Sequence, residues 1–388
     1  MNKNRSVSLA MISVSHGVNH IYQLAIPVII PKILDAYGLS VTTAGVLISI
    51  FSLSYALFQT PSGYLSKFLG RKKVIILGFV ILSVSFLFLG LADNIILFAF
   101  LLFIAGIGGS TYHPNGVPLL SQYYEENRGQ ALGFHQTGGS LGSFIAPLMI
   151  GALVFFLDWR LALTLLSIPG MILSIIIWFK IIEPEKNQRE LKSEELGDSK
   201  RTGFNMYRES MILIGAAILY TIGLRGMDSF ANLYFTKGRG ITDFIEASFL
   251  FSTLKIAGLF SGPLCGKLSD MLGRKKVLIA LVCVESISIY AITVIPTGIL
   301  LIPSLIFGFS SFGLLAVGDA FLVDITPKEY MTAVFGISFT LSFFTQAIIP
   351  TVLGAIVDYS NSFDMALIVL SVIVPFSILL ILRVKGKN

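Results

Sequence analysis

The four histidines of this chain are His16, His20, His113 and His135, and imidazole is well suited to carrying protons. Its ordinary pKa of about 6.5 lets protonation respond to modest pH differences. Each histidine lies in a long, largely apolar stretch. Ionisable groups are costly in a bilayer, and those kept there usually line a cavity or pair with one another. We therefore predict that His16, His20 and His135 carry protons and that His113 contacts a substrate. The alternative is that each is only a satisfied hydrogen-bonding group.

Two polar stripes follow helical spacing, so each stripe occupies one face of a helix. The first comprises His16, Asn19, His20 and Gln23, and the second comprises Thr221, Arg225, Asp228 and Asn232. We expect both stripes to face one cavity, in which the substrate contacts include Asn19, Gln23, Arg225 and Asn232.

Arg225 is the residue best suited to bind an anion, because a guanidinium fork matches carboxylate or phosphonate oxygens. Asp228, one turn further on, would hold Arg225 in place or carry a proton. A purely structural Arg225–Asp228 pair remains the alternative.

Four further polar residues interrupt apolar stretches. Lys255 and Glu285 lie at similar depths, which predicts a structural pair between them. Asp319 is expected to face the cavity, as a proton carrier, or a gate. Gln346 would donate a hydrogen bond to substrate or serve packing.

Enzymatic and metal-binding motifs are not evident in this sequence. It contains no nucleotide-binding loop, zinc helix motif or Ser-His-Asp arrangement, and its His, Cys and acidic residues lack convincing ligand spacing. We therefore expect no cofactor, no metal ion and no enzyme activity.

The composition indicates that these residues are positioned by membrane helices. Of 388 residues, 54% are hydrophobic and only 13% are charged, and the mean hydropathy is +0.82. A span needs about 20 apolar residues. The sequence predicts an all-α integral membrane protein with twelve transmembrane helices, near 7–34, 42–66, 74–92, 95–118, 129–156, 161–182, 208–236, 243–266, 276–296, 298–323, 330–357 and 363–383.

The basic residues sort by side of the membrane. With the N-terminus inside, 22 of the 28 Lys and Arg residues fall in inner segments. This bias predicts a multi-pass protein of the cell membrane with both termini in the cytoplasm. It also explains the net charge of +6 without nucleic acid as a partner.

A repeated pattern divides the chain into two halves. Residues 63–73 read Gly-Tyr-Leu-Ser-Lys-Phe-Leu-Gly-Arg-Lys-Lys, and residues 266–276 read Gly-Lys-Leu-Ser-Asp-Met-Leu-Gly-Arg-Lys-Lys, an offset of 203. The same offset relates Gly133, Pro147 and Gly151 to Gly336, Pro350 and Gly354. We predict two pseudo-symmetric six-helix bundles, 1–182 and 208–388, joined by a charged cytoplasmic linker, 183–207.

This repeated loop resembles the signature loop of the major facilitator superfamily. The resemblance implies a gating role for Gly63, Arg71, Gly266, Asp270 and Arg274, although the basic residues could equally be topology anchors. Lys67 replaces the family's acidic residue in the first loop. The resemblance therefore implies that only Asp270 latches the inner side, against the start of the fifth span near Arg128.

A finer resemblance is to the fosmidomycin-resistance branch of drug exporters. Residues 111–115 read Thr-Tyr-His-Pro-Asn and residues 134–143 read Phe-His-Gln-Thr-Gly-Gly-Ser-Leu-Gly-Ser, similar to that branch's Phe-His-Pro-Glu and Gln-x-Gly-Gly-Asn-x-Gly elements. His16-Gly-Val-Asn-His20 resembles its His-x-x-Asn-Asp. His20 and Asn115 stand where that branch has acidic residues. We therefore do not infer the substrate of that branch for this chain.

Together these observations predict a monomeric, proton-coupled secondary transporter of small organic anions. It would work by rocking of the two bundles, with export favoured by the resemblance. The alternatives are uptake of an organic acid by proton symport, efflux of cationic drugs, and a membrane-embedded enzyme or sensor.

Overall fold

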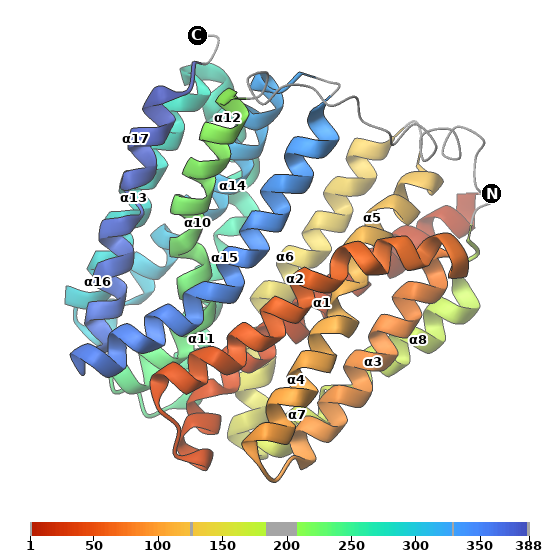
Figure 1. Ribbon diagram of the computed structural model, residues 1–388, viewed down its shortest axis with the longest axis horizontal. Helices are drawn as coiled ribbons and strands as arrows, with labels where there is room; N and C mark the ends of the chain where they lie inside the picture. Colours follow the sequence, from red (N-terminus) through yellow and green to blue (C-terminus); the bar gives the residue numbers. More distant parts are fainter. Residues whose placement is uncertain (1, 125–126, 184–207, 328–329, 386–388) are drawn as a thin grey trace.

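The computed structural model describes residues 2–124, 127–183, 208–327 and 330–385, which are almost wholly helical (Figure 1). The helices of the first half are α1 (Asn2–Tyr37), α2 (Val41–Leu69), α3 (Arg71–Leu91), α4 (Ile95–Ser110), α5 (Tyr112–Tyr123), α6 (Arg128–Phe156), α7 (Trp159–Leu165) and α8 (Ser167–Lys180). Those of the second half are α10 (Arg208–Leu233), η2 (Tyr234–Gly238), α11 (Phe244–Ile256), α12 (Gly258–Leu272), α13 (Arg274–Val294), η3 (Thr297–Ile299), α14 (Leu301–Ile325), α15 (Met331–Ser360), α16 (Phe363–Ile373) and α17 (Phe376–Arg383).

Eleven helical segments in the described residues are long and apolar enough to cross a membrane. Several consist of two helices in series, such as α4 with α5 and α11 with α12. They match eleven of the twelve predicted spans. The remaining predicted span is α1, which has 36 residues but carries the polar stripe that lowers its mean hydropathy.

The helices form two bundles, coloured red to yellow and green to blue in Figure 1. Contacts between the bundles run mainly through α1 with α10, α2 with α15, and α6 with α11. The predicted linker, residues 183–207, lies outside the described residues except for Glu183. The Glu183 carboxylate accepts a hydrogen bond at 2.6 Å from the backbone N–H of Arg71, at the start of α3, where the helix dipole favours a negative charge.

The repeated loops have the same backbone conformation in both bundles. α2 and α12 end before Gly70 and Gly273, whose φ angles are +86° and +93°. Each glycine N–H donates at 3.0 Å to the carbonyl of a serine, Ser66 or Ser269. Only glycine adopts such angles without strain, so the repeat identified in the sequence is also a structural repeat.

Polar contacts between the bundles gather at the end of the molecule where α1 is followed by α2, the lower end of Figure 1, here called the distal end. The Asp358 carboxylate accepts hydrogen bonds from the N–H groups of Val41 (3.0 Å) and Thr42 (2.8 Å) at the start of α2. Lys237 and Asp35 form an ion pair of 2.6 Å. These contacts hold the bundles together at the distal end.

Candidate functional site

The four histidines come from three helices and meet in one cluster. His16 and His20 lie on α1, His113 on α5 and His135 on α6. The ring centroids of His16 lie 4.8 Å from His20, 5.2 Å from His113 and 4.2 Å from His135. His16 and His135 are buried, whereas His20 and His113 are partly exposed. The predicted histidine cluster is therefore present.

Hydrogen bonds order the buried part of this cluster. His16 Nδ1 lies 3.0 Å from the carbonyl oxygen of His135, and His16 Nε2 lies 3.2 Å from His20 Nε2. Because a carbonyl oxygen only accepts, His16 Nδ1 carries a proton, and in the neutral ring Nε2 then presents its lone pair. The Tyr112 hydroxyl lies 3.0 Å from His135 Nε2 and donates to the carbonyl of Ile12.

His113 is placed by a break between α4 and α5. Pro114 has no N–H, so it cannot bond the carbonyl of Ser110 one turn earlier. The Ser62 hydroxyl of α2 reaches that carbonyl at 3.3 Å and shares its proton between it and the carbonyl of Gln59, which lies at 2.8 Å. A freed carbonyl is thus satisfied by a neighbouring helix, as irregular membrane helices require.

Asn19 and Gln23 continue the polar stripe of α1. The Gln23 amide donates to Asn19 Oδ1 at 2.6 Å, and Tyr55 Oη donates to the same oxygen at 3.1 Å. Asn19 Nδ2 donates to the carbonyl of Gly109 at 3.1 Å. Asn19 is therefore buried, with both its amide oxygen and its amide nitrogen in hydrogen bonds, and the partly exposed Gln23 is the better placed of the two to contact a substrate.

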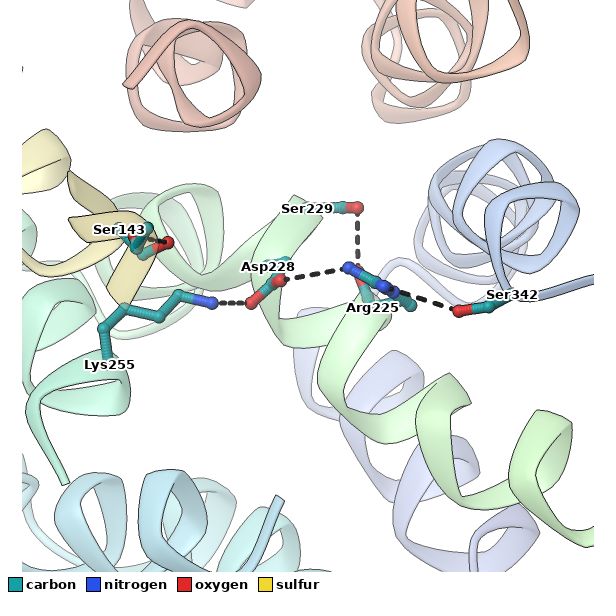
Figure 2. A network of polar contacts seen from close by, with 7 residues as sticks. Ser143, Arg225, Asp228, Ser229, Lys255 and Ser342 are labelled. Atoms are coloured by element: carbon teal, nitrogen blue, oxygen red, sulfur yellow. Dashed lines mark hydrogen bonds and ion pairs between the residues drawn. The ribbon is translucent and has the colours of Figure 1, made fainter. Parts of the chain in front are cut away.

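The second bundle presents a charged triad (Figure 2). Lys255 of α11 forms an ion pair with Asp228 of α10, and Arg225 Nη1 lies 4.0 Å from the other Asp228 oxygen. The Lys255 side chain is 2% exposed and that of Arg225 is 21% exposed. The predicted Lys255–Glu285 pair is wrong. Glu285 of α13 is fully buried inside its bundle, where it accepts a hydrogen bond from Ser311 at 2.6 Å.

Arg225 retains unused donors in this triad. Its Nη2 donates a long bond of 3.4 Å to Ser342 Oγ, and its buried Nε has no hydrogen-bond partner in the part of the chain that the structure describes. Since Lys255 offsets the charge of Asp228, the triad carries one net positive charge. Such a group can bind one carboxylate or a similar anion.

α15 joins the triad to the first bundle. Phe343 stacks on Tyr55 with a centroid distance of 5.3 Å and lies 6.5 Å from His113. The preceding residue, Ser342, contacts Arg225. Residues of both polar stripes thus lie on either side of one contact between the bundles, and the cavity that the stripes are expected to share stays a prediction. Tyr55, Tyr112, Ser342 and Phe343 were not predicted, because uncharged residues in apolar runs carry no distinct signal.

Three predicted site residues remain, namely Asn232, Gln346 and Asp319. Asn232 is fully buried and donates to the carbonyl of Val28 at 2.5 Å, which joins the bundles. Gln346 lies one turn after Ser342, with its Oε1 buried and unpartnered. Asp319 is exposed on α14. These residues keep their substrate or proton roles only as predictions.

The predicted gating residues contact their own loops and, in the second bundle, the end of α14. Arg274 pairs with Asp270 at 2.5 Å and with Asp324 at 3.0 Å. Gly63 and Gly266 each supply a carbonyl that accepts a serine hydroxyl at 2.7 Å. The side chain of Arg128 is outside the described residues, so the Asp270 latch stays a prediction.

Three imidazoles are arranged as metal ligands could be. One ring nitrogen from each of His16, His20 and His113 lies within 4.8 Å of the others. Their sequence spacing gave no sign of this, because His113 is nearly a hundred residues from the other two.

The family model of the Major Facilitator Superfamily matches residues 12–312 and 243–387. The Probable L-galactonate transporter of Escherichia coli (strain K12) is 24% identical over 380 residues, which cover 91% of this chain and 83% of that protein. The Probable galactarate/D-glucarate transporter GudP of Bacillus subtilis (strain 168) is 26% identical over 370 residues, covering 85% and 81%. The Multi-drug resistance efflux pump PmrA of Streptococcus pneumoniae serotype 4 is 25% identical over 349 residues, covering 87% and 84%.

Solved structures support the fold. A bacterial homolog of the human lysosomal transporter Spinster, crystallised in an inward-facing and occupied conformation, superposes with a TM-score of 0.84 at 17% identity. The match covers 99% of this chain and 98% of that one. The twelve-helix, two-bundle architecture predicted from the sequence is confirmed.

Proposed function

Because the chain belongs to the Major Facilitator Superfamily, and is therefore a multi-pass membrane transporter rather than an enzyme, we propose that it carries small organic anions by proton-coupled alternating access. The resemblance to the fosmidomycin-resistance branch is a finer prediction. The division into bundles 1–182 and 208–388, the placement in the cell membrane with cytoplasmic termini, and the monomeric state belong to the same proposal.

The observation that carries the proposal is the incomplete pairing of Arg225. A buried N–H donor normally has a hydrogen-bond acceptor, yet the buried Nε of Arg225 has none among the described residues, and Nη2 makes one long bond. A bound carboxylate would accept from these donors. The relatives named as transporters of L-galactonate and of galactarate/D-glucarate support an acidic substrate of this size.

Protons would move through the histidine cluster on the facing side. His20 and His113 are partly exposed, and His20 shares a hydrogen bond with the buried His16. A proton entering at His20 could therefore pass along this bond to a buried position. Asp228 is committed to Lys255, which makes it less suited than the histidines to exchange a proton.

The contacts at the distal end define the state of the cycle. They close the outer side if the termini are cytoplasmic, and the substrate would then exchange with the cytoplasm. Rocking of the bundles about the Arg225 level would break these contacts and expose the site on the other side. We propose export as the direction, and efflux of cationic drugs is the second candidate because PmrA is a relative.

The test uses the purified chain in liposomes that contain a pH-sensitive dye. A pH gradient is imposed, and sugar acids, sulfoacetate, phosphonates and cationic drugs are added one at a time. We expect an organic anion to drive proton flux, and Arg225→Ala to lower its apparent affinity about 10- to 150-fold, the value of hydrogen bonds to a charged group. Arg225→Lys would recover little, since lysine lacks the fork.

Arg383→Ala, at the end of α17, is the matched control and should transport normally. Proton flux driven only by cationic drugs would refute the anion site and favour the second candidate. The direction of the pH gradient that accelerates release of the anion from the liposomes distinguishes export from uptake.

A further inference from the structure

We propose that His16, His20 and His113 bind one divalent first-row transition metal ion, with zinc(II) as the representative. The ion would lie beside the contact between the bundles, and a water molecule or a small anion would complete its coordination. This proposal concerns equilibrium binding and holds whether or not the chain couples transport to protons.

The distance between the first two ligand atoms suits a shared ion. In a tetrahedral site with Zn–N bonds of about 2.0–2.1 Å, two ligand nitrogens lie about 3.3 Å apart. His16 Nε2 and His20 Nε2 are 3.2 Å apart, and they project from successive turns of α1. An ion between them replaces the single hydrogen bond that now joins the two rings, and the proton that His20 Nε2 donates in this bond moves to Nδ1 of the same ring.

The third ligand approaches from another helix. His113 lies edge-on to His16, with an interplanar angle of 87°, and its ligand atom is within 4.8 Å of the other two. Its residue is partly exposed, and binding a shared ion would require its imidazole to turn so that its nitrogen comes within about 3.3 Å of the other two ligand nitrogens. Three protein ligands leave a fourth position open.

His16 is also oriented as metal-binding histidines are. Such a histidine usually donates its second ring N–H to a carbonyl or carboxylate, which fixes the ring and the tautomer. His16 Nδ1 makes this bond to the carbonyl of His135 at 3.0 Å. The lone pair on Nε2 therefore already points at the site before an ion arrives.

The donor set selects the class of ion. Three neutral imidazoles suit zinc, cobalt, nickel and copper, whereas magnesium and calcium require several hard oxygen ligands. Within the described residues this ligand group contains three histidines and no carboxylate, and the carboxylate of Asp228 is engaged by Lys255. We therefore expect no competition from millimolar magnesium.

Binding is measured on the full-length chain purified through a tag without histidines. Cobalt(II) is titrated and followed by its visible d–d absorption, and zinc(II) is titrated against a chromophoric chelator in excess magnesium. We expect one ion per chain and a tetrahedral cobalt spectrum. His16→Ala, His20→Ala and His113→Ala should each weaken binding by at least about tenfold, since even loss of an outer partner costs 10- to 100-fold.

The matched control is His135→Phe, which removes an imidazole of the same cluster but keeps the carbonyl that orients His16. It should bind the ion within about threefold of the wild type, against the tenfold or larger loss expected at a ligand. Size-exclusion profiles identify any variant that fails to fold. If His16→Ala fails to fold, His20→Gln, at a partly exposed position, takes its place as the ligand variant. Absence of stoichiometric binding, or equal losses in His135→Phe and His113→Ala, would overturn the proposal.

Discussion

At the scale of single residues, Lys255 shows what determines the ion-pair partner of a buried charge in a membrane protein. Its side chain is 2% exposed, so its charge must be balanced within the protein. Sequence depth suggested Glu285, but that side chain points into the interior of its bundle, toward Ser311. Asp228 lies on the neighbouring helix α10, beside the contact between the bundles, and it is the carboxylate that balances the charge of Lys255.

We predict that Asp228→Asn destabilises the chain by about 3–5 kcal/mol, because it leaves a buried lysine charge unpaired. The measurement is the free energy of unfolding in mixed micelles. Asp228→Asn combined with Lys255→Met removes both charges and should recover most of the loss. Glu285→Gln is the matched control and should cost far less, since Ser311 is neutral. Equal losses in Asp228→Asn and Glu285→Gln would show that Lys255 does not depend on Asp228.

At the scale of elements, close approach of α1 and α6 brings the histidines of both helices together. A Cβ atom added to Gly142 of α6 would lie 2.2 Å from the carbonyl oxygen of Gly17 on α1. Small residues that let backbones approach are typical of membrane helix interfaces. The stacking of His16 on His135, at 4.2 Å, depends on the same approach.

Gly142→Ala is therefore expected to destabilise the first bundle by about 1–3 kcal/mol, the usual cost of overpacking. It should also separate the two rings, since α1 must move away from α6. Thermal unfolding measures the first effect, and the perturbed imidazole signals in NMR spectra measure the second. Gly133 lies on the same helix with no described atom within 4 Å of an added Cβ, so Gly133→Ala should leave stability unchanged or raise it by up to about 1 kcal/mol. A neutral Gly142→Ala would contradict the packing argument.

At the scale of the whole molecule, hydrogen bonds and an ion pair between the two bundles hold them together at the distal end. Asp358 caps the N-terminus of α2 in the other bundle, where the helix dipole favours its charge. Further from this end, Ser252 of α11 donates to the carbonyl of Phe144 on α6 at 2.8 Å. A transporter that alternates must break such contacts once in each cycle.

We predict that Asp358→Asn weakens the distal closure by about 0.3–1 kcal/mol, as for an exposed charge at a helix N-terminus. The reporter is Ser248→Cys in a chain without Cys265 and Cys283. Ser248 is 1% exposed between α11 and α6, and its hydroxyl has no partner, so the change to cysteine costs no hydrogen bond. Maleimide labelling of this cysteine should become about two- to fivefold faster. Asp93→Asn, a carboxylate in the α3–α4 loop, should leave the labelling rate unchanged.

The sequence by itself determined the membrane class, the repeat and the polar stripes. Each of these depends on composition or on spacing along one helix: the apolar runs, the shared loop around Gly70 and Gly273, and His16 with His20 on one face of α1. Local rules of helix geometry and hydropathy are enough for such features, which is why the structure reproduced them.

Only the tertiary structure decided which polar groups meet across helices. Lys255 pairs with Asp228 rather than Glu285, His113 joins two histidines about a hundred residues away, and Ser342 and Phe343 link Arg225 to the first bundle. The rotation of each helix about its axis and its depth against its neighbours set these contacts. A shift of one turn moves a side chain by about 5.4 Å, more than the length of any hydrogen bond, and spacing within a single helix carries no information about such a shift.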